Sequence, residues 1–164
     1  MNRNKNSDLS FIKEEYFKKR LRNYLKLIFS LDLNIRAVLL FGSVATGKAK
    51  YNDDYISDID LLIVCDGLPN NASKRRKLIF KLTESVTSGI QDIWWTSREM
   101  EKNVESKFYL ILDAFDEGVI LYDPEDFLQE LKEKLFNELK QKGVVKTELY
   151  WRWPIKKFGD KIEF

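Results

Sequence analysis

The sequence of 164 residues contains no histidine and a single cysteine, Cys65. Without histidine, the chain cannot use Ser-His-Asp or Cys-His catalysis, and it cannot build a histidine-ligated zinc site. One cysteine cannot form an internal disulfide, which is typical of a reducing cytoplasm. The chain also lacks an N-terminal apolar signal region and any apolar run of the ~18 residues that a membrane span needs. We therefore predict a cytoplasmic protein with no membrane partner, whose chemistry depends on carboxylates, lysines, hydroxyls, backbone amides or a hard metal ion.

A large excess of charge of one sign is missing as well. Charged residues make up 33% of the chain, but the net charge is only +2, which predicts no strong attraction to nucleic acid. Two basic stretches leave nucleic acid open as a partner. Residues 1–26 carry eight Lys/Arg against three Asp/Glu, and Lys74-Arg75-Arg76-Lys77 form a basic run. We interpret this run first as the solvated face of a helix, and otherwise as a patch for an acidic partner or a polynucleotide.

Hydrophobic periodicity predicts helices that alternate with strands. Helices are expected over 9–31, 73–88 and 98–115, and from Asp123-Pro124 to Gly143; strands are expected over 36–41, 59–65, 90–95 and 118–122. This alternation, with 44% hydrophobic residues, predicts a single α/β domain over residues 1–164. It would carry an N-terminal helix, a C-terminal helix and an aromatic tail around Trp151 and Trp153, a surface that would suit packing on the domain, a homodimer or another partner.

Asp58 and Asp60 stand at the head of an apolar run, Ile59 to Cys65. Side chains two positions apart in a strand share a face, so these carboxylates would lie roughly 6–7 Å apart and repel each other. A cation between them would remove the repulsion, and oxygen-only ligands suit Mg²⁺ or Mn²⁺. The pair therefore predicts a metal site, although a solvated turn fits the same pattern.

Gly42 and Ser43 follow the preceding apolar run, which ends at Phe41. Free backbone amides where a strand passes into a helix bind phosphate, and glycine lets the phosphate approach closely. Ser43 would add a hydroxyl donor, and Gly47 would keep the following loop compact. An ordinary turn with a serine N-cap is the alternative interpretation.

Asp92 lies in the middle of a third apolar run, Ile90 to Trp95. An acid inside such a strand is costly to bury unless it is paired or binds a metal, or unless that face is wet. If this strand lies beside the strand that follows Asp58, three carboxylates can converge. Three carboxylates, two metal ions and a phosphate-binding turn are the parts needed for phosphoryl or nucleotidyl transfer.

These residues resemble the signature of a known superfamily. Phe41-Gly42-Ser43, Gly47 and the segment from Ser57 to Val64 are similar to the signature of the DNA polymerase β-like nucleotidyltransferases, in particular their small minimal nucleotidyltransferase members. Gln91-Asp92-Ile93 looks like the strand with the third aspartate, and Glu117 to Tyr122 like the closing strand, so the resemblance covers roughly Ala37 to Tyr122. It implies a small mixed sheet backed by helices, with a nucleoside triphosphate and Mg²⁺ or Mn²⁺ as substrate and cofactor.

Carried over by position, the resemblance implies a role for each matching residue. Gly42 and Ser43 would contact the terminal phosphates, Asp58 and Asp60 would bind both metals, and Asp92 would complete one metal site and help to deprotonate the acceptor. The fourteen residues from Val44 to Ser57 exceed the usual spacing, with the extra length expected near Lys50 to Asp54. Arginines common in small members are replaced by Val44 and Thr46, and Lys48 is the candidate substitute.

Two functions follow from this resemblance. The first is the transfer of a nucleoside monophosphate, most plausibly AMP, to an acceptor hydroxyl. The acceptor could be a helical HEPN-type toxin for which this chain would be the antitoxin. The second is a weak or inactive binding module that masks a partner protein.

Overall fold

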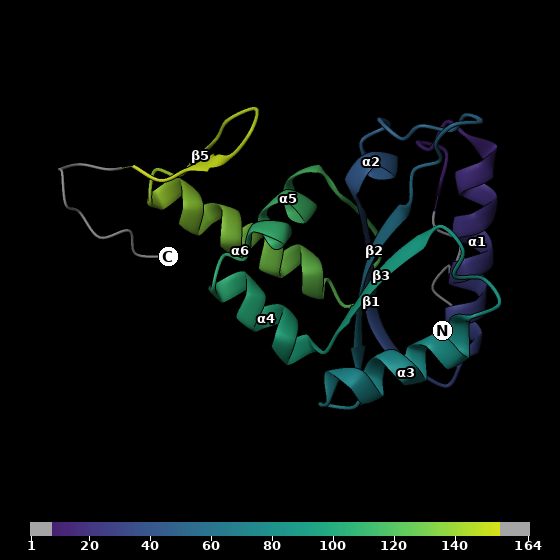
Figure 1. The fold of residues 1–164 in the computed structure, drawn as a ribbon. Helices are drawn as coiled ribbons and strands as arrows, with labels where there is room; N and C mark the ends of the chain where they lie inside the picture. The colour runs from purple at the N-terminus through teal and green to yellow at the C-terminus, as the bar shows by residue number, and fades with distance from the viewer. Residues whose placement is uncertain (1–7, 155–164) are drawn as a thin grey trace.

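Figure 1 shows a computed structural model of the protein, in which residues 8–154 are described. Its centre is a four-stranded sheet in the order β3-β2-β1-β4. The strands are β1 (Asn34–Phe41), β2 (Ile59–Asp66), β3 (Ile90–Trp95) and β4 (Val119–Tyr122). β1 runs antiparallel to both β2 and β4, whereas β2 and β3 are parallel. The expected small mixed sheet backed by helices is confirmed.

One face of the sheet is covered by α1 (Glu15–Ser30) and α3 (Ala72–Thr83). α1 buries a stripe at helical spacing that includes Phe17, Leu21, Tyr24 and Ile28. The predicted helix was wrong at its start, because residues 9–14 are not helical. Leu9 and Ile12 are nevertheless buried in the same core, so their apolar character reports burial rather than helix.

The other face is covered by α4 (Ser97–Glu105), α5 (Tyr109–Glu117) and α6 (Phe127–Gln141). The single helix expected over 98–115 is wrong, because the chain breaks it at Ser106 to Phe108. Lys107 adopts φ 51° there, and its buried ammonium group forms an ion pair with Glu138 at 2.9 Å. This turn lets both helices pack on the sheet, which one straight helix could not do.

The last long helix begins later than predicted, at Phe127 instead of Asp123-Pro124. Asp123 still caps it, because its carboxylate accepts a hydrogen bond from the backbone amide of Gln129 at 3.0 Å. The capping residue Asp123 thus lies four positions before Phe127, the first residue of the helix. The turn between them includes Asp126 in a left-handed conformation, φ 56°.

Beyond α6, a small hairpin pairs β5 (Val145–Lys146) with β6 (Trp151–Arg152). Trp151 and Trp153 pack against the core beside α6. The outer parts of the predicted domain, residues 1–7 and 155–164, lie outside the described residues. Within the described part of the chain, none of the helices is long and apolar enough to cross a membrane.

Candidate active site

The turn after β1 lies against the head of β2. The antiparallel register pairs Phe41 with Asp60, and Gly42 follows as the first residue of α2 (Gly42–Ala45). Gly42 has φ +71°, and a Cβ atom built there would overlap the Oδ2 atom of Asp60. Only glycine therefore lets the turn pack this closely against the carboxylate, and sequence positions 42 and 60 form one local structure.

Asp58 and Asp60 are electrostatically coupled. The pKa of Asp60 is raised, first by burial and then by the negative charge of Asp58. Ile59, Leu61 and Ile63 point into the core beneath α1 and α3, so alternation along the strand turns Asp60 toward the opposite face. A partly buried carboxylate whose charge is disfavoured by a neighbouring carboxylate suits a divalent cation as ligand.

Asp92 does not join this pair. The parallel register places Gln91 beside Asp60 and Asp92 beside Leu61, and paired residues of adjacent strands point to the same face. The carboxylate of Asp92 accepts hydrogen bonds from the hydroxyl of Tyr24 and from Nε1 of Trp94, both on the α1 side of the sheet. The predicted convergence of three carboxylates is wrong, because alternation along β3 turns Asp92 away.

Gln91 lies where Asp92 was expected. Its Nε2 atom donates a hydrogen bond to Oδ2 of Asp58 at 2.7 Å, and its side chain is exposed. Among residues 8–154, no group of three or more carboxylate, cysteine or histidine side chains is placed to hold a metal ion. The carboxylates of Asp58 and Asp60 and the side-chain amide of Gln91 therefore lie together where β2 begins.

The long segment between Ser43 and Asp58 contains a closed surface excursion. Ser57 donates its backbone amide to the carbonyl of Lys50, and the amide of Lys50 donates to Oγ of Ser57, each at 2.9 Å. The exposed residues 51–56 lie between these two, and the ring of Tyr51 stacks on Tyr16 of α1 at 4.4 Å between centroids. The hydrogen bonds between Lys50 and Ser57 therefore bring the two ends of this segment together before the chain reaches Asp58.

Gly47 and Lys48 lie at the exposed end of the turn. Gly47 has φ +70° with open space around it, and the backbone amide of Lys48 donates to the carbonyl of Ser43 at 2.9 Å. The pKa of Glu117 is held below its usual range mainly by Lys146, with a smaller contribution from Lys48. Lys48 thus lies close enough to a carboxylate to influence its charge, and its side chain is exposed.

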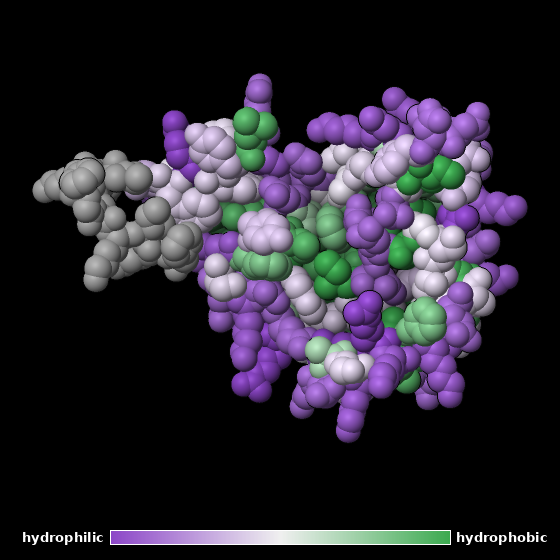
Figure 2. Space-filling model, in the orientation of Figure 1, coloured by the Kyte–Doolittle hydropathy of each residue, from purple (hydrophilic) through white to green (hydrophobic). Residues whose placement is uncertain are grey.

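An open groove of about 1160 Å³ runs along β3 and includes Asp60 and Gln91 in its lining. Figure 2 shows apolar side chains gathered in the hollow between the α1–α3 side and the α4–α6 side, where β3 lies in Figure 1. Phe80 of α3 and Trp95 of β3 line it too. Sequence reasoning missed both this groove and Gln91, whose only signal was its place next to Asp92.

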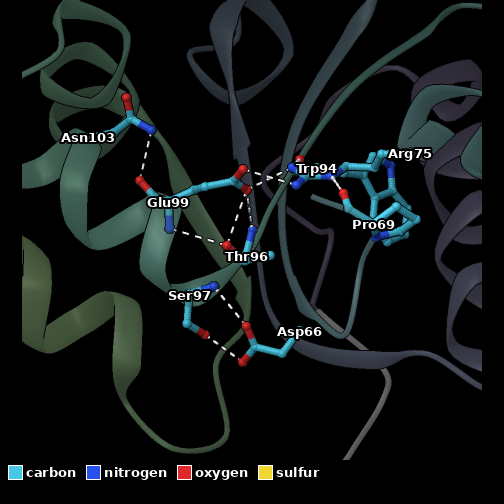
Figure 3. A network of polar contacts seen from close by, with 8 residues as sticks. All are labelled: Asp66, Pro69, Arg75, Trp94, Thr96, Ser97, Glu99 and Asn103. Carbon is cyan, nitrogen blue, oxygen red and sulfur yellow. Dashed lines mark hydrogen bonds and ion pairs between the residues drawn. The ribbon is translucent and has the colours of Figure 1, made fainter. Parts of the chain in front are cut away.

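A network of polar contacts around Arg75 and Glu99 lines part of this groove (Figure 3). Arg75 is buried and forms two hydrogen bonds with the carboxylate of Glu99, at 2.7 and 3.0 Å. It also donates to the backbone carbonyls of Pro69 and Trp94. Arg75 is therefore not part of a solvated basic face, and this part of the interpretation of Lys74 to Lys77 is wrong.

Several solved structures are similar to this chain at low identity. One, a toxin–antitoxin with AMP-PNP, is 18% identical with a TM-score of 0.45, covering 76% of this chain and 85% of that chain. A second, a tri-AMPylated Shewanella oneidensis HEPN toxin with MNT antitoxin, is 14% identical with a TM-score of 0.46 (76% and 87%). A third, the toxin–antitoxin MntA-HepT, is 16% identical with a TM-score of 0.47 (76% and 87%).

No curated protein sequence matches the chain. The family model described as polymerase beta, nucleotidyltransferase matches residues 23–127. This match contains β1 through β4, the Gly42–Ser43 turn and both aspartates at the head of β2. Because it spans well over half of the 164 residues, the chain belongs to the polymerase β nucleotidyltransferase family.

Proposed function

We propose that this chain transfers a nucleoside monophosphate, AMP in the first instance, from a nucleoside triphosphate to an acceptor hydroxyl. The acceptor oxygen forms a bond to the α-phosphorus, the bond from that phosphorus to the β-phosphate oxygen breaks, and pyrophosphate leaves with the electron pair. The hydroxyl proton passes to solvent. The observation that carries the proposal is the contact between Gly42 and the carboxylate of Asp60, which joins the phosphate-binding turn to the paired acids.

Asp58 and Asp60 are the residues that would hold Mg²⁺ or Mn²⁺. Their fit is supported by the raised pKa of Asp60, which burial and the neighbouring carboxylate cause, and by the all-oxygen donor set. When bound, the cation would neutralise charge on the phosphates and on the leaving oxygen.

The remaining residues of the turn bind and orient the triphosphate in this proposal. Gly42 lets the turn pack directly against the carboxylate of Asp60, and Ser43 offers a hydroxyl donor next to it. Gly47 keeps the following turn compact through its left-handed conformation, and Lys48 supplies positive charge at the exposed end. This role for Lys48 compensates for the absence of arginines at Val44 and Thr46.

We further propose that the acceptor belongs to a helical HEPN-type protein and that the pair works as a toxin–antitoxin module in the cytoplasm. The resemblance of the motifs to minimal nucleotidyltransferases supports the partner. The buried, unpaired thiol of Cys65 is consistent with a reducing compartment. Co-expression with a small helical protein encoded next to this chain, followed by co-purification, tests this pairing.

One observation favours the second candidate function, a weak or inactive binding module. Asp92 is turned to the other face of the sheet by Tyr24 and Trp94, so a carboxylate is missing from the position where the resemblance implies one. In this case the protein would mask its partner without modifying it.

Incubation with ATP labelled in the α-phosphate, Mg²⁺ and candidate acceptors separates the two functions. Transfer should be lost in Asp58→Asn and in Asp60→Asn. The exposed carboxylate of Asp53 lies in the excursion, so Asp53→Asn is the matched control and should retain transfer. Absence of both label transfer and metal-dependent nucleotide binding in the wild type would favour the binding module.

A further inference from the structure

We propose that Gln91 takes the third ligand position of the cation site and that, in the absence of nucleotide, this site binds one divalent cation per chain, not two. This inference rests on the proposed function, since it concerns the same site.

Gln91 lies on the same face of the sheet as Asp60. Asp60 pairs with Gln91 across the parallel strands β2 and β3, so the two side chains share a face. Gln91 also reaches Asp58, to whose Oδ2 atom its Nε2 donates at 2.7 Å. The amide thus lies beside both members of the acidic pair, and the register leaves no other β3 residue opposite Asp60.

Asp92 is held on the opposite face of the sheet by two hydrogen bonds. Tyr24 is fully buried, and its hydroxyl donates to Oδ2 of Asp92, as does Nε1 of Trp94. Turning Asp92 toward Asp60 would require β3 to flip and would leave both donors without this acceptor inside the core. A buried donor left without an acceptor is costly, so the structure opposes the exchange of Asp92 for Gln91.

The side-chain amide of Gln91 can offer one oxygen atom to a cation. With Nε2 engaged by Asp58, Oε1 is the atom that Gln91 can offer to a cation, and amide oxygens are ordinary ligands of hard metals. Two carboxylates and one neutral amide carry two negative charges, which one divalent cation balances. In the absence of nucleotide, a second cation would meet uncompensated positive charge, and Gln91 cannot act as a base toward the acceptor.

Titration with Mn²⁺ alone, followed by the electron paramagnetic resonance signal of the free ion, tests the assignment. We expect one Mn²⁺ per wild-type chain. Gln91→Glu, an exposed and nearly isosteric change, should tighten Mn²⁺ binding by about tenfold or more, because ligand charge sets the affinity of such sites. Asp92→Asn is the matched control and should leave the affinity unchanged while it lowers the melting temperature.

The outcomes distinguish this inference from the proposed function. Two Mn²⁺ ions in the wild type, or a loss of Mn²⁺ in Asp92→Asn as large as in Asp58→Asn, would overturn the role of Gln91 and leave the proposed function standing. If neither the wild type nor Gln91→Glu binds Mn²⁺, the cation site fails and the proposed function fails with it. Thermal melts of each variant show whether a lost signal comes from unfolding.

Discussion

The carboxylate of Asp92 accepts a hydrogen bond from the hydroxyl of Tyr24, which lies 68 positions earlier in the chain. This contact fastens the edge strand β3 to helix α1. It also raises the pKa of Tyr24, for which burial is the main cause and the charge of Asp92 the next. An acid that first suggests catalysis thus joins a helix to the sheet.

The first prediction follows from this contact. Tyr24→Phe removes the hydroxyl and leaves the carboxylate of Asp92 with one donor fewer. We expect the free energy of unfolding to fall by about 1.5–3 kcal/mol, as for other hydrogen bonds to charged groups, measured by urea denaturation. Mn²⁺ affinity should stay at the wild-type value. A loss of Mn²⁺ binding in a folded Tyr24→Phe variant would contradict the assignment of Asp92 to the scaffold.

The second prediction separates backbone strain from collision at Gly42. Gly42 and Gly47 have nearly equal φ values, +71° and +70°, but only Gly42 has Asp60 against it. Alanine at either position should cost about 1–2 kcal/mol for the left-handed conformation. Gly42→Ala should in addition displace Asp60 and weaken Mn²⁺ binding, whereas Gly47→Ala should not. Equal Mn²⁺ affinities in the two folded variants would show that Asp60 does not depend on this contact.

The third prediction concerns the pH dependence of the ion pair between Arg75 and Glu99. Arg75 is the largest cause that holds the pKa of Glu99 below its ordinary 4.5. A lowered folded-state pKa stabilises the folded protein above the unfolded value, and this stabilisation is lost as the pH falls through the folded value. Glu99→Gln should therefore be less stable than the wild type at pH 7, and the difference should shrink below about pH 4.5.

Chemical denaturation of both proteins from pH 7 to pH 3 measures this difference. Glu101, which is exposed on the same helix, provides the control Glu101→Gln, for which no such convergence is expected. A wild-type advantage over Glu99→Gln that stayed constant down to pH 3 would contradict the role of the charge pair.

The fourth prediction uses the closed base of the excursion. Because Lys50 and Ser57 hydrogen-bond to each other, residues 51–56 can be replaced by an Asn-Gly turn without moving Asp58. We expect the Mn²⁺ affinity to stay within about twofold of the wild type, with a melting temperature lowered by the lost stacking of Tyr51 on Tyr16. Loss of Mn²⁺ binding in a shortened but folded chain would show that the excursion supports the site.

Local patterns in the sequence predicted much of the fold and the proximity of Gly42 to the acidic pair Asp58 and Asp60. Buried strands such as Ile59–Asp66 form long apolar runs, and glycine next to an acid-headed strand marks the turn that packs against Asp60. The split between α4 and α5 escaped prediction, because both helices continue one apolar pattern and only the buried Lys107, paired with Glu138, interrupts it. The burial of Arg75 escaped prediction as well, since its partner Glu99 is 24 positions away.

The sequence by itself determined that Asp58 and Asp60 stand two apart at the head of a strand and that Gly42 and Ser43 follow the strand before it. Only the tertiary structure decided which residue of β3 completes that edge. Both faces of the sheet are covered by helices, so Ile90 and Trp94 on one face look as apolar as Ile93 and Trp95 on the other. Alternation alone therefore could not tell Gln91 from Asp92. The register of β3 on β2, set by packing against α1, made that choice.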